Sequence, residues 1–221
     1  MAKGSFKPAR VYFLDADDTM WDTIGTQWQK HIYIAKTHYG KRLTKKEIRE
    51  HYGRPMGQYV CAQYGTNDEE QALKHSMDYR RQFPKRLFPY TLPTLRCLRT
   101  AGVLRGVVTT GTRAGFDNDR TAMQIPARLL NYTQTADESP FLKPDRRVFD
   151  PALTWLMTQG IEPDEACYVG DALDDGRAAL SAGLRFLGVR SGLVTAREFH
   201  RELGAISIPH IGYLVQPPIE N

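Results

Sequence analysis

The feature that most constrains the fold is an apolar stretch near the N-terminus that ends in acidic residues, Val11-Tyr12-Phe13-Leu14-Asp15-Ala16-Asp17-Asp18-Thr19. Its first four residues favour a buried β-strand. Because side chains alternate along an extended chain, we expect Asp15 and Asp17 to point the same way if that conformation persists beyond Leu14. Two carboxylates on one face repel each other, and a divalent cation such as Mg²⁺, which prefers oxygen ligands, relieves that repulsion. The alternative is a strand that ends in a solvated acidic turn, and this stretch taken alone fits both interpretations.

Three further segments place polar residues beside apolar runs. Val107-Val108-Thr109-Thr110-Gly111 ends in hydroxyl groups, and Cys167-Tyr168-Val169-Gly170-Asp171-Ala172-Leu173-Asp174-Asp175 ends in carboxylates. Lys143-Pro144-Asp145 precedes a segment with helical periodicity. Taken in order with the first stretch, these segments resemble the four signature motifs of the haloacid dehalogenase-like superfamily, most of whose members are phosphatases. The resemblance runs from Val11 to about Gly192.

After Thr91, the sequence predicts helices that alternate with strands. The predicted strands are 103–108, 166–169 and 185–189, with weaker ones at 127–133 and 206–208. The predicted helices are 92–99, 112–123, 146–159 and 174–182. This alternation predicts an α/β fold, a Rossmann-like parallel sheet with helices on both faces, in which ligands bind at the carboxyl ends of the strands.

Residues 21–89 show helical spacing and no strand signal, with a capping-box pattern from Thr44 to Glu47. We therefore predict a small α-helical cap domain at 21–89, inserted into an α/β catalytic core formed by 1–20 and 90–221. One branch of the superfamily carries a mobile cap at this point, so the resemblance implies a lid that closes over the site and selects the substrate.

One cap segment, Gly53-Arg54-Pro55, resembles the cap loop that reaches the active site in that branch. The resemblance implies that Arg54 binds a second anionic group of the substrate. The alternative for this residue is an exposed arginine in a turn.

The resemblance also assigns roles at the first two motifs. It implies that Asp15 is the nucleophile that forms an aspartyl-phosphate, and that Asp17 is the general acid that later becomes the general base. An aspartate at the second position favours phosphate ester chemistry over dehalogenation or phosphonate cleavage. Asp18 departs from the pattern, because the family usually has glycine there. Thr109 is the expected phosphate-binding hydroxyl, although the paired threonines leave Thr110 open.

At the remaining motifs the resemblance implies groups that balance charge. The backbone N–H groups of Thr110 and Gly111 would assist Thr109. Lys143 would neutralise charge on the nucleophile and the phosphoryl group; in isolation it would be read as a solvated loop lysine.

The fourth motif supplies the metal site. Asp171 would bind Mg²⁺ together with Asp15 and the backbone carbonyl of Asp17, and Asp175 would orient metal-bound water or Lys143. We expect Asp174 to cap the following helix.

Composition and charge argue against several other classes of protein. The 221 residues carry a net charge of +5, with basic residues spread along the chain rather than gathered among aromatics, so we expect no nucleic-acid partner. No apolar run is long enough to cross a membrane, and the N-terminus lacks the apolar core of a signal peptide. Three distant cysteines favour a reducing compartment, and we expect a cytoplasmic protein.

The sequence thus predicts a Mg²⁺-dependent phosphomonoesterase that hydrolyses a small phosphorylated metabolite. A phosphomutase that uses the same aspartyl-phosphate is the alternative within the enzyme class. A non-catalytic binding protein on the same fold is the alternative outside it, and a phosphatase acting on nucleic-acid ends is a third. The substrate and the oligomeric state stay open.

Overall fold

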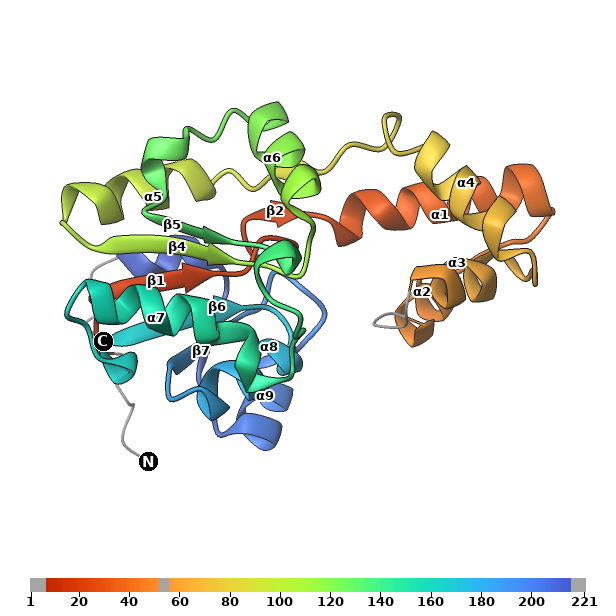
Figure 1. Ribbon diagram of the computed structural model, residues 1–221. Helices are drawn as coiled ribbons and strands as arrows, with labels where there is room; N and C mark the ends of the chain where they lie inside the picture. The colour runs from red at the N-terminus through yellow and green to blue at the C-terminus, as the bar shows by residue number, and fades with distance from the viewer. Residues whose placement is uncertain (1–6, 52–55, 216–221) are drawn as a thin grey trace. The chain divides into compact units, whose positions relative to one another are not determined.

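A computed structural model describes residues 7–51 and 56–215 of the chain (Figure 1). The chain forms two compact units, one of Met1–Trp21 with Leu87–Asn221 and one of Asp22–Arg86. A two-stranded pairing of β2 (Trp21–Asp22) with β3 (Arg86–Leu87) lies where the chain passes between the units. Within the described residues, no helix has the length and apolar character needed to cross a membrane.

The larger unit is built on a six-stranded sheet in which every pairing is parallel, in the order β5-β4-β1-β6-β7-β8. Its strands are β1 (Val11–Leu14), β4 (Leu104–Val108), β5 (Tyr132–Gln134), β6 (Ala166–Gly170), β7 (Arg185–Val189) and β8 (Ser207–Ile208). The chain leaves β1 first to one side and later to the other. The strand order therefore reverses beside β1, the point at which open α/β sheets bind their ligands.

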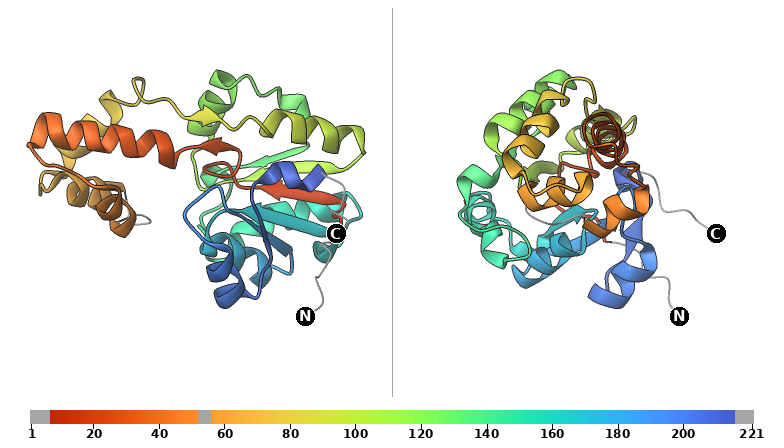
Figure 2. Two further views of the ribbon diagram at one scale, coloured as in Figure 1. Left: turned by 180° about the vertical axis from the view of Figure 1, so that it is seen from behind. Right: turned by 90° about the vertical axis from the view of Figure 1, so that its right-hand side faces the viewer.

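Helices cover both faces of this sheet (Figures 1 and 2). Tyr12 and Leu14 of β1 pack on one face with residues of α5 (Thr91–Thr100), α6 (Arg113–Ala122) and the 3₁₀ helix η5 (Ile211–Val215). Val11 and Phe13 pack on the other face with residues of α7 (Asp150–Thr158), α8 (Leu173–Ser181) and α9 (Ala196–Leu203). Side chains alternate between the two faces of the sheet and helices cover both faces, so all four side chains of β1 are buried. The predicted fold class is confirmed.

Several elements differ from the sequence-based expectation. The predicted strand at 127–133 is a 3₁₀ helix, η1 (Ala127–Leu129), followed by β5, and the predicted helix at 146–159 begins with a 3₁₀ turn, η3 (Arg146–Phe149). Helix α9 was not predicted, although it carries a capping box from Thr195 to Glu198 and ends at Gly204 in the left-handed region. Charged residues dominate α9 and Phe199 is its single buried residue, but Ala196, Phe199 and Leu203 follow helical spacing, so this helix did carry a sequence signal.

Among its described residues, the smaller unit contains four helices and its share of β2 and β3, joined by turns and loops. Its helices are α1 (Ile24–Tyr39), α2 (Lys45–His51), α3 (Met56–Tyr64) and α4 (Glu69–Asp78). Its core is apolar and includes Ile34, Ile48 and Val60. A buried polar chain runs beside this core, in which His31 Nδ1 lies 2.8 Å from Tyr64 Oη and Lys30 Nζ donates to Ser76 Oγ over 3.1 Å.

Lys30 is a source of pH-dependent stability in this unit. It is 5% exposed, and burial, followed by the charges of Arg80 and Lys85, lowers its pKa from 10.5 to about 8. Below pH 8 both the folded and unfolded chains hold the proton, so the full cost of burying the charge is present. Between pH 8 and 10.5 the unfolded chain binds more protons, and the free energy of unfolding rises with pH.

We therefore expect Lys30→Met to raise the free energy of unfolding at pH 7 by about 1–3 kcal/mol, because an apolar side chain replaces a buried charge. Urea unfolding at pH 7 and pH 10 measures this, and the variant should also lose part of the rise with pH. Lys74→Met, which changes an exposed lysine of α4, is the matched control. A Lys30→Met protein less stable than the parent at pH 7 would contradict this account.

Candidate active site

The sheet register brings three of the four motifs to one edge. Leu14 pairs with Val107 on β4 and with Val169 on β6, so these strands end nearly level. Asp15 N–H donates to the Val169 carbonyl over 2.9 Å, which extends the β1–β6 pairing by one residue. Asp15, Thr109 and Asp171 each follow the last residue of a strand, and therefore lie at the same carboxyl edge.

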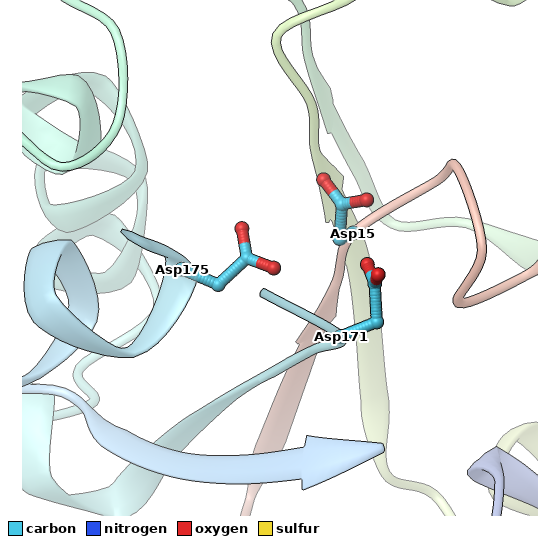
Figure 3. Close-up of side chains that lie close together, drawn as sticks. All are labelled: Asp15, Asp171 and Asp175. Atoms are coloured by element: carbon cyan, nitrogen blue, oxygen red, sulfur yellow. The ribbon is translucent and has the colours of Figure 1, made fainter. Parts of the chain in front are cut away.

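Three carboxylates converge there (Figure 3). Asp15 follows β1, Asp171 follows β6 and Asp175 lies on α8, and one carboxylate oxygen from each lies within 4.8 Å of the others. Burial raises the pKa of Asp15 to about 7, assisted by Asp175 and Asp17 and opposed by Lys143. Burial of the Asp171 carboxyl, with Asp175, Asp15 and Asp18 nearby, raises its pKa well above the usual range. Ionising these carboxyl groups is therefore costly in the protein alone, and a nearby cation would favour their charged form.

Lys143 is the cation that the structure places among these carboxylates. Its Nζ lies 2.6 Å from Asp15 Oδ1 and 2.7 Å from Asp175 Oδ1, and it also contacts Tyr168 Oη. Burial alone would lower the pKa of this amine, but Asp15 and Asp175 together raise it above the usual value. Lys143 is therefore a protonated, 5% exposed side chain rather than a solvated loop lysine.

Asp17 and Asp18 form the turn after β1. Asp17 is half-buried, and its Oδ1 accepts a hydrogen bond of 2.9 Å from the indole N–H of Trp21. Asp18 is buried and has a φ of 55°. This left-handed conformation explains why glycine suits the position, and aspartate is among the few other residues that adopt it readily. The predicted irregularity at Asp18 is thus accommodated without disturbing Asp15.

The paired threonines differ in burial. Thr109 is 4% exposed, whereas Thr110 is exposed to solvent. Gly111 N–H donates to Thr109 Oγ1 over 3.2 Å, which leaves the hydroxyl hydrogen of Thr109 able to donate elsewhere. The geometry therefore favours Thr109 over Thr110 as the phosphate-binding hydroxyl. The Gly111 N–H, which we expected to face the phosphoryl group, donates to Thr109 Oγ1 in this structure.

The two aspartates at the start of α8 divide their roles differently from the prediction for Asp174. Asp175 Oδ2 accepts from the Ala172 N–H over 3.0 Å while its Oδ1 binds Lys143, so Asp175 both caps the helix and holds the lysine. Asp174 is exposed and pairs with Arg177 at 2.9 Å. The prediction that Asp174 caps the helix was wrong, because the helix begins at Leu173 and Ala172 is its N-cap residue.

The remaining predicted site residue, Arg54, lies outside the described residues.

Three residues near the site were not singled out by sequence reasoning. Tyr168 sits within an apolar run, and Trp21, which falls in the predicted cap range 21–89, belongs to the larger unit and packs against Phe116. Gly192 follows β7 and abuts Asp171: a Cβ there would overlap Asp171 Oδ2 and lie 2.6 Å from its Cγ. No local sequence signal marks these positions, because each acts through a partner distant in the chain or through the shape of the fold.

Gly192→Ala is therefore expected to displace the Asp171 carboxylate and to reduce metal-dependent turnover by about 10–100-fold, since small misplacements in a site cost rate steeply. Steady-state kinetics across a Mg²⁺ titration measure this. Ser191→Ala is the matched control, because it removes the neighbouring buried hydroxyl Oγ, which has no partner among the described residues, without adding an atom. Equal activity in the alanine variant at 192 and the parent would contradict the steric argument.

Comparisons with known proteins agree with the motif order. Residues 12–189 match the family model of the haloacid dehalogenase-like hydrolases. The chain is 26% identical over 229 residues to glyceraldehyde 3-phosphate phosphatase from Methanothermobacter thermautotrophicus, covering 94% of this chain and 97% of that protein.

Solved structures also share the fold. A Thermotoga maritima protein with a provisional assignment as beta-phosphoglucomutase has a TM-score of 0.77 at 17% identity, covering 93% of this chain and 96% of that one. A predicted phosphoglycolate phosphatase from Haemophilus somnus has a TM-score of 0.74 at 20% identity, covering 96% and 98%. The resemblance inferred from the four motifs is confirmed: the chain belongs to the haloacid dehalogenase-like hydrolase family.

Proposed function

We propose that this hydrolase is a Mg²⁺-dependent phosphomonoesterase that transfers the phosphoryl group of a small metabolite to Asp15 and then to water. The observation that supports this most directly is the buried group of Asp15, Lys143, Asp171 and Asp175 at the carboxyl edge of the sheet. A nucleophilic carboxylate, a fixed cation and further carboxylates for a metal are the components that phosphoryl transfer through a covalent intermediate requires.

The donor set fits a magnesium ion. Carboxylate oxygens are hard ligands, and those of Asp15, Asp171 and Asp175 lie close enough together to share one cation. The raised pKa values of Asp15 and Asp171 reflect burial together with repulsion between neighbouring carboxylates, which a divalent ion would relieve. Asp15, Asp171 and the backbone carbonyl of Asp17 would hold the ion, with Asp175 beside them. When bound, Mg²⁺ supplies charge neutralisation for the phosphoryl oxygens.

The chain's own residues account for the transfer step. Lys143 and Tyr168 both contact Oδ1 of Asp15, which leaves Oδ2 as the oxygen that attacks phosphorus. The bond between phosphorus and the ester oxygen breaks as the bond to Asp15 forms. Thr109 donates its hydroxyl hydrogen to a phosphoryl oxygen, and Lys143 disperses the charge that develops there.

Asp17 is suited to handle the protons. In the first step its carboxyl group gives a proton to the departing alcohol oxygen, and in the second step the resulting carboxylate takes a proton from the water that attacks the phosphorus. The indole N–H of Trp21 donates to Oδ1 of Asp17 and orients the carboxyl group that carries out both proton transfers.

The substrate class follows from the relatives. The full-length relative is a glyceraldehyde 3-phosphate phosphatase, which favours a phosphorylated metabolite of similar size over a polymer. The helical unit is the proposed cap that selects among such substrates, as in the branch of the superfamily that carries its insert at this position.

Phosphate release from a panel of phosphorylated metabolites, with Mg²⁺ and with chelator, tests this proposal. The panel contains glyceraldehyde 3-phosphate, phosphoglycolate, sugar phosphates, nucleotides, cofactor phosphates and an aryl phosphate. We expect release that requires Mg²⁺, with a rank order that identifies the substrate. No release from any compound, with interconversion of sugar phosphate isomers instead, would replace hydrolysis by the phosphomutase alternative. If the protein neither released phosphate nor interconverted sugar phosphates, the non-catalytic binding protein would be the remaining interpretation.

A further inference from the structure

We propose that Tyr168 is a positioning residue that fixes Lys143 and aligns the nucleophile with the phosphate-binding end of β4. The inference rests on the proposed function for its catalytic consequence. Its structural part, the hold on Lys143, rests on contacts alone.

Tyr168 occupies a central place in the sheet. It is the third residue of β6, pairs with Phe13 of β1, and is fully buried. Phe149 packs edge-on against its ring, with centroids 4.9 Å apart and planes at 72°. The ring is thus held by the core, and the position of its hydroxyl group is determined by the fold rather than by solvent.

The contacts of the hydroxyl group determine which hydrogen bonds it donates and which it accepts. Tyr168 Oη lies 2.7 Å from the Val108 carbonyl oxygen, 3.2 Å from Asp15 Oδ1, and within hydrogen-bond distance of Lys143 Nζ. A carbonyl only accepts and an ammonium only donates, so the phenol donates its single hydrogen to Val108, the nearer of its two acceptors, and accepts from Lys143.

This arrangement satisfies the ammonium group completely. Lys143 has three N–H donors, and they meet Asp15 Oδ1, Asp175 Oδ1 and Tyr168 Oη. Two of these acceptors are charged and the phenol is neutral. Tyr168 therefore provides the third point that defines where the charge sits.

The residues that Tyr168 and Lys143 contact explain why this position matters for the reaction. Val108 is the residue before Thr109, and Asp15 is the proposed nucleophile. The hydroxyl group thus links the end of β4 directly to Lys143, and Lys143 in turn binds Asp15 at the end of β1. Without it the third N–H of a 5% exposed ammonium lacks an acceptor, and the lysine shifts relative to both Asp15 and the phosphoryl site.

Tyr168→Phe tests the proposal, because it keeps the ring and removes only the oxygen. We expect kcat on the best substrate of the panel to fall by about 10–100-fold with KM changed less than threefold, since the geometry is needed mainly in the transition state. Tyr12→Phe is the matched control: Tyr12 is equally confined, on the neighbouring strand β1, but its hydroxyl group accepts from Ala9 N–H and not from the site. The control should retain parental kcat.

Coupling to Lys143 separates positioning from a general structural effect. In a Lys143→Met background, Tyr168→Phe should reduce the residual turnover by less than threefold, because the group that Tyr168 positions is already absent. Effects that multiply in the double variant would overturn the proposal.

A measurement without substrate keeps the inference distinct from the proposed function. In ¹⁵N spectra of the lysine ammonium groups, the Lys143 signal, assigned by its loss in Lys143→Met, should show slow hydrogen exchange in the parent and faster exchange in Tyr168→Phe. Unchanged exchange would overturn the role of Tyr168 even if the enzyme is active. Faster exchange in a protein that hydrolyses no phosphate ester would support the contact and reject the function.

Discussion

Replacing Asp15 by asparagine is expected to reduce turnover by on the order of 10⁴-fold or more while leaving the protein folded. The amide has the same shape and keeps an oxygen that can accept from Lys143, so the contacts that hold the side chain survive. It is a far weaker nucleophile than a carboxylate, and the covalent step is lost. Single-turnover phosphate release on the best substrate measures the effect, with circular dichroism and urea unfolding to verify the fold.

Asp174→Asn is the matched control for this experiment. It makes the same chemical change on an exposed aspartate that pairs with Arg177, outside the carboxylate cluster, and it should leave turnover within about twofold of the parent. Asp15→Asn with near-parental turnover would remove Asp15 from the role of nucleophile, whatever the fate of the other assignments.

Replacing Asp171 by asparagine is expected to weaken the response to Mg²⁺ in two independent measurements. The carboxylate stands beside those of Asp15 and Asp175, and its removal leaves fewer charged ligands for a divalent cation. We expect turnover at a fixed Mg²⁺ concentration to fall by about 10²–10³-fold, with partial recovery at higher concentrations, because weakened binding is offset by mass action.

The second measurement needs no substrate. A ligand that binds only the folded state stabilises it by about 2.7 kcal/mol at 100 times its dissociation constant, so Mg²⁺ should raise the Tm of the parent protein. The rise should be much smaller in Asp171→Asn. Asp175→Asn tests the cluster further, but it also removes a helix cap and a contact to Lys143, so its effect mixes metal binding with stability. A full Mg²⁺-induced rise in Asp171→Asn would exclude this residue as a ligand.

Much of the fold could be predicted because the core strands have a strong signal. Val11 to Leu14 and Ala166 to Val169 are continuous apolar runs, as expected for strands buried on both faces, and the polar residues after them mark the carboxyl ends. The convergence of Asp15, Thr109 and Asp171 followed from parallel pairing alone. Lys143 could be placed only through the motif resemblance, because nothing in its local sequence distinguishes it from a surface lysine.

The site features that the sequence did not reveal depend on contacts between residues that are distant in the chain, and local sequence patterns do not encode such contacts. Tyr168 reads as one more apolar residue of β6 until its hydroxyl group is seen to meet Lys143, which lies 25 positions earlier in the chain. Asp174 and Asp175 are adjacent in sequence, and their difference depends on a helix start that sequence locates only to within a residue or two. Gly192 is constrained by the volume of Asp171, and volume has no signature in a linear pattern.

The central place of β1 has a consequence for the order in which the protein can be made. The strand leaves the ribosome long before one of its two neighbours, β6, which is completed only at Gly170. Until then a fully apolar strand has an open edge that can pair with another nascent chain. The lysine that neutralises Asp15 is likewise synthesised 128 residues after it. A chain halted before Ala166 should therefore depend on a chaperone to stay dispersed, and the active site can form only after Asp171 and Asp175 have been synthesised.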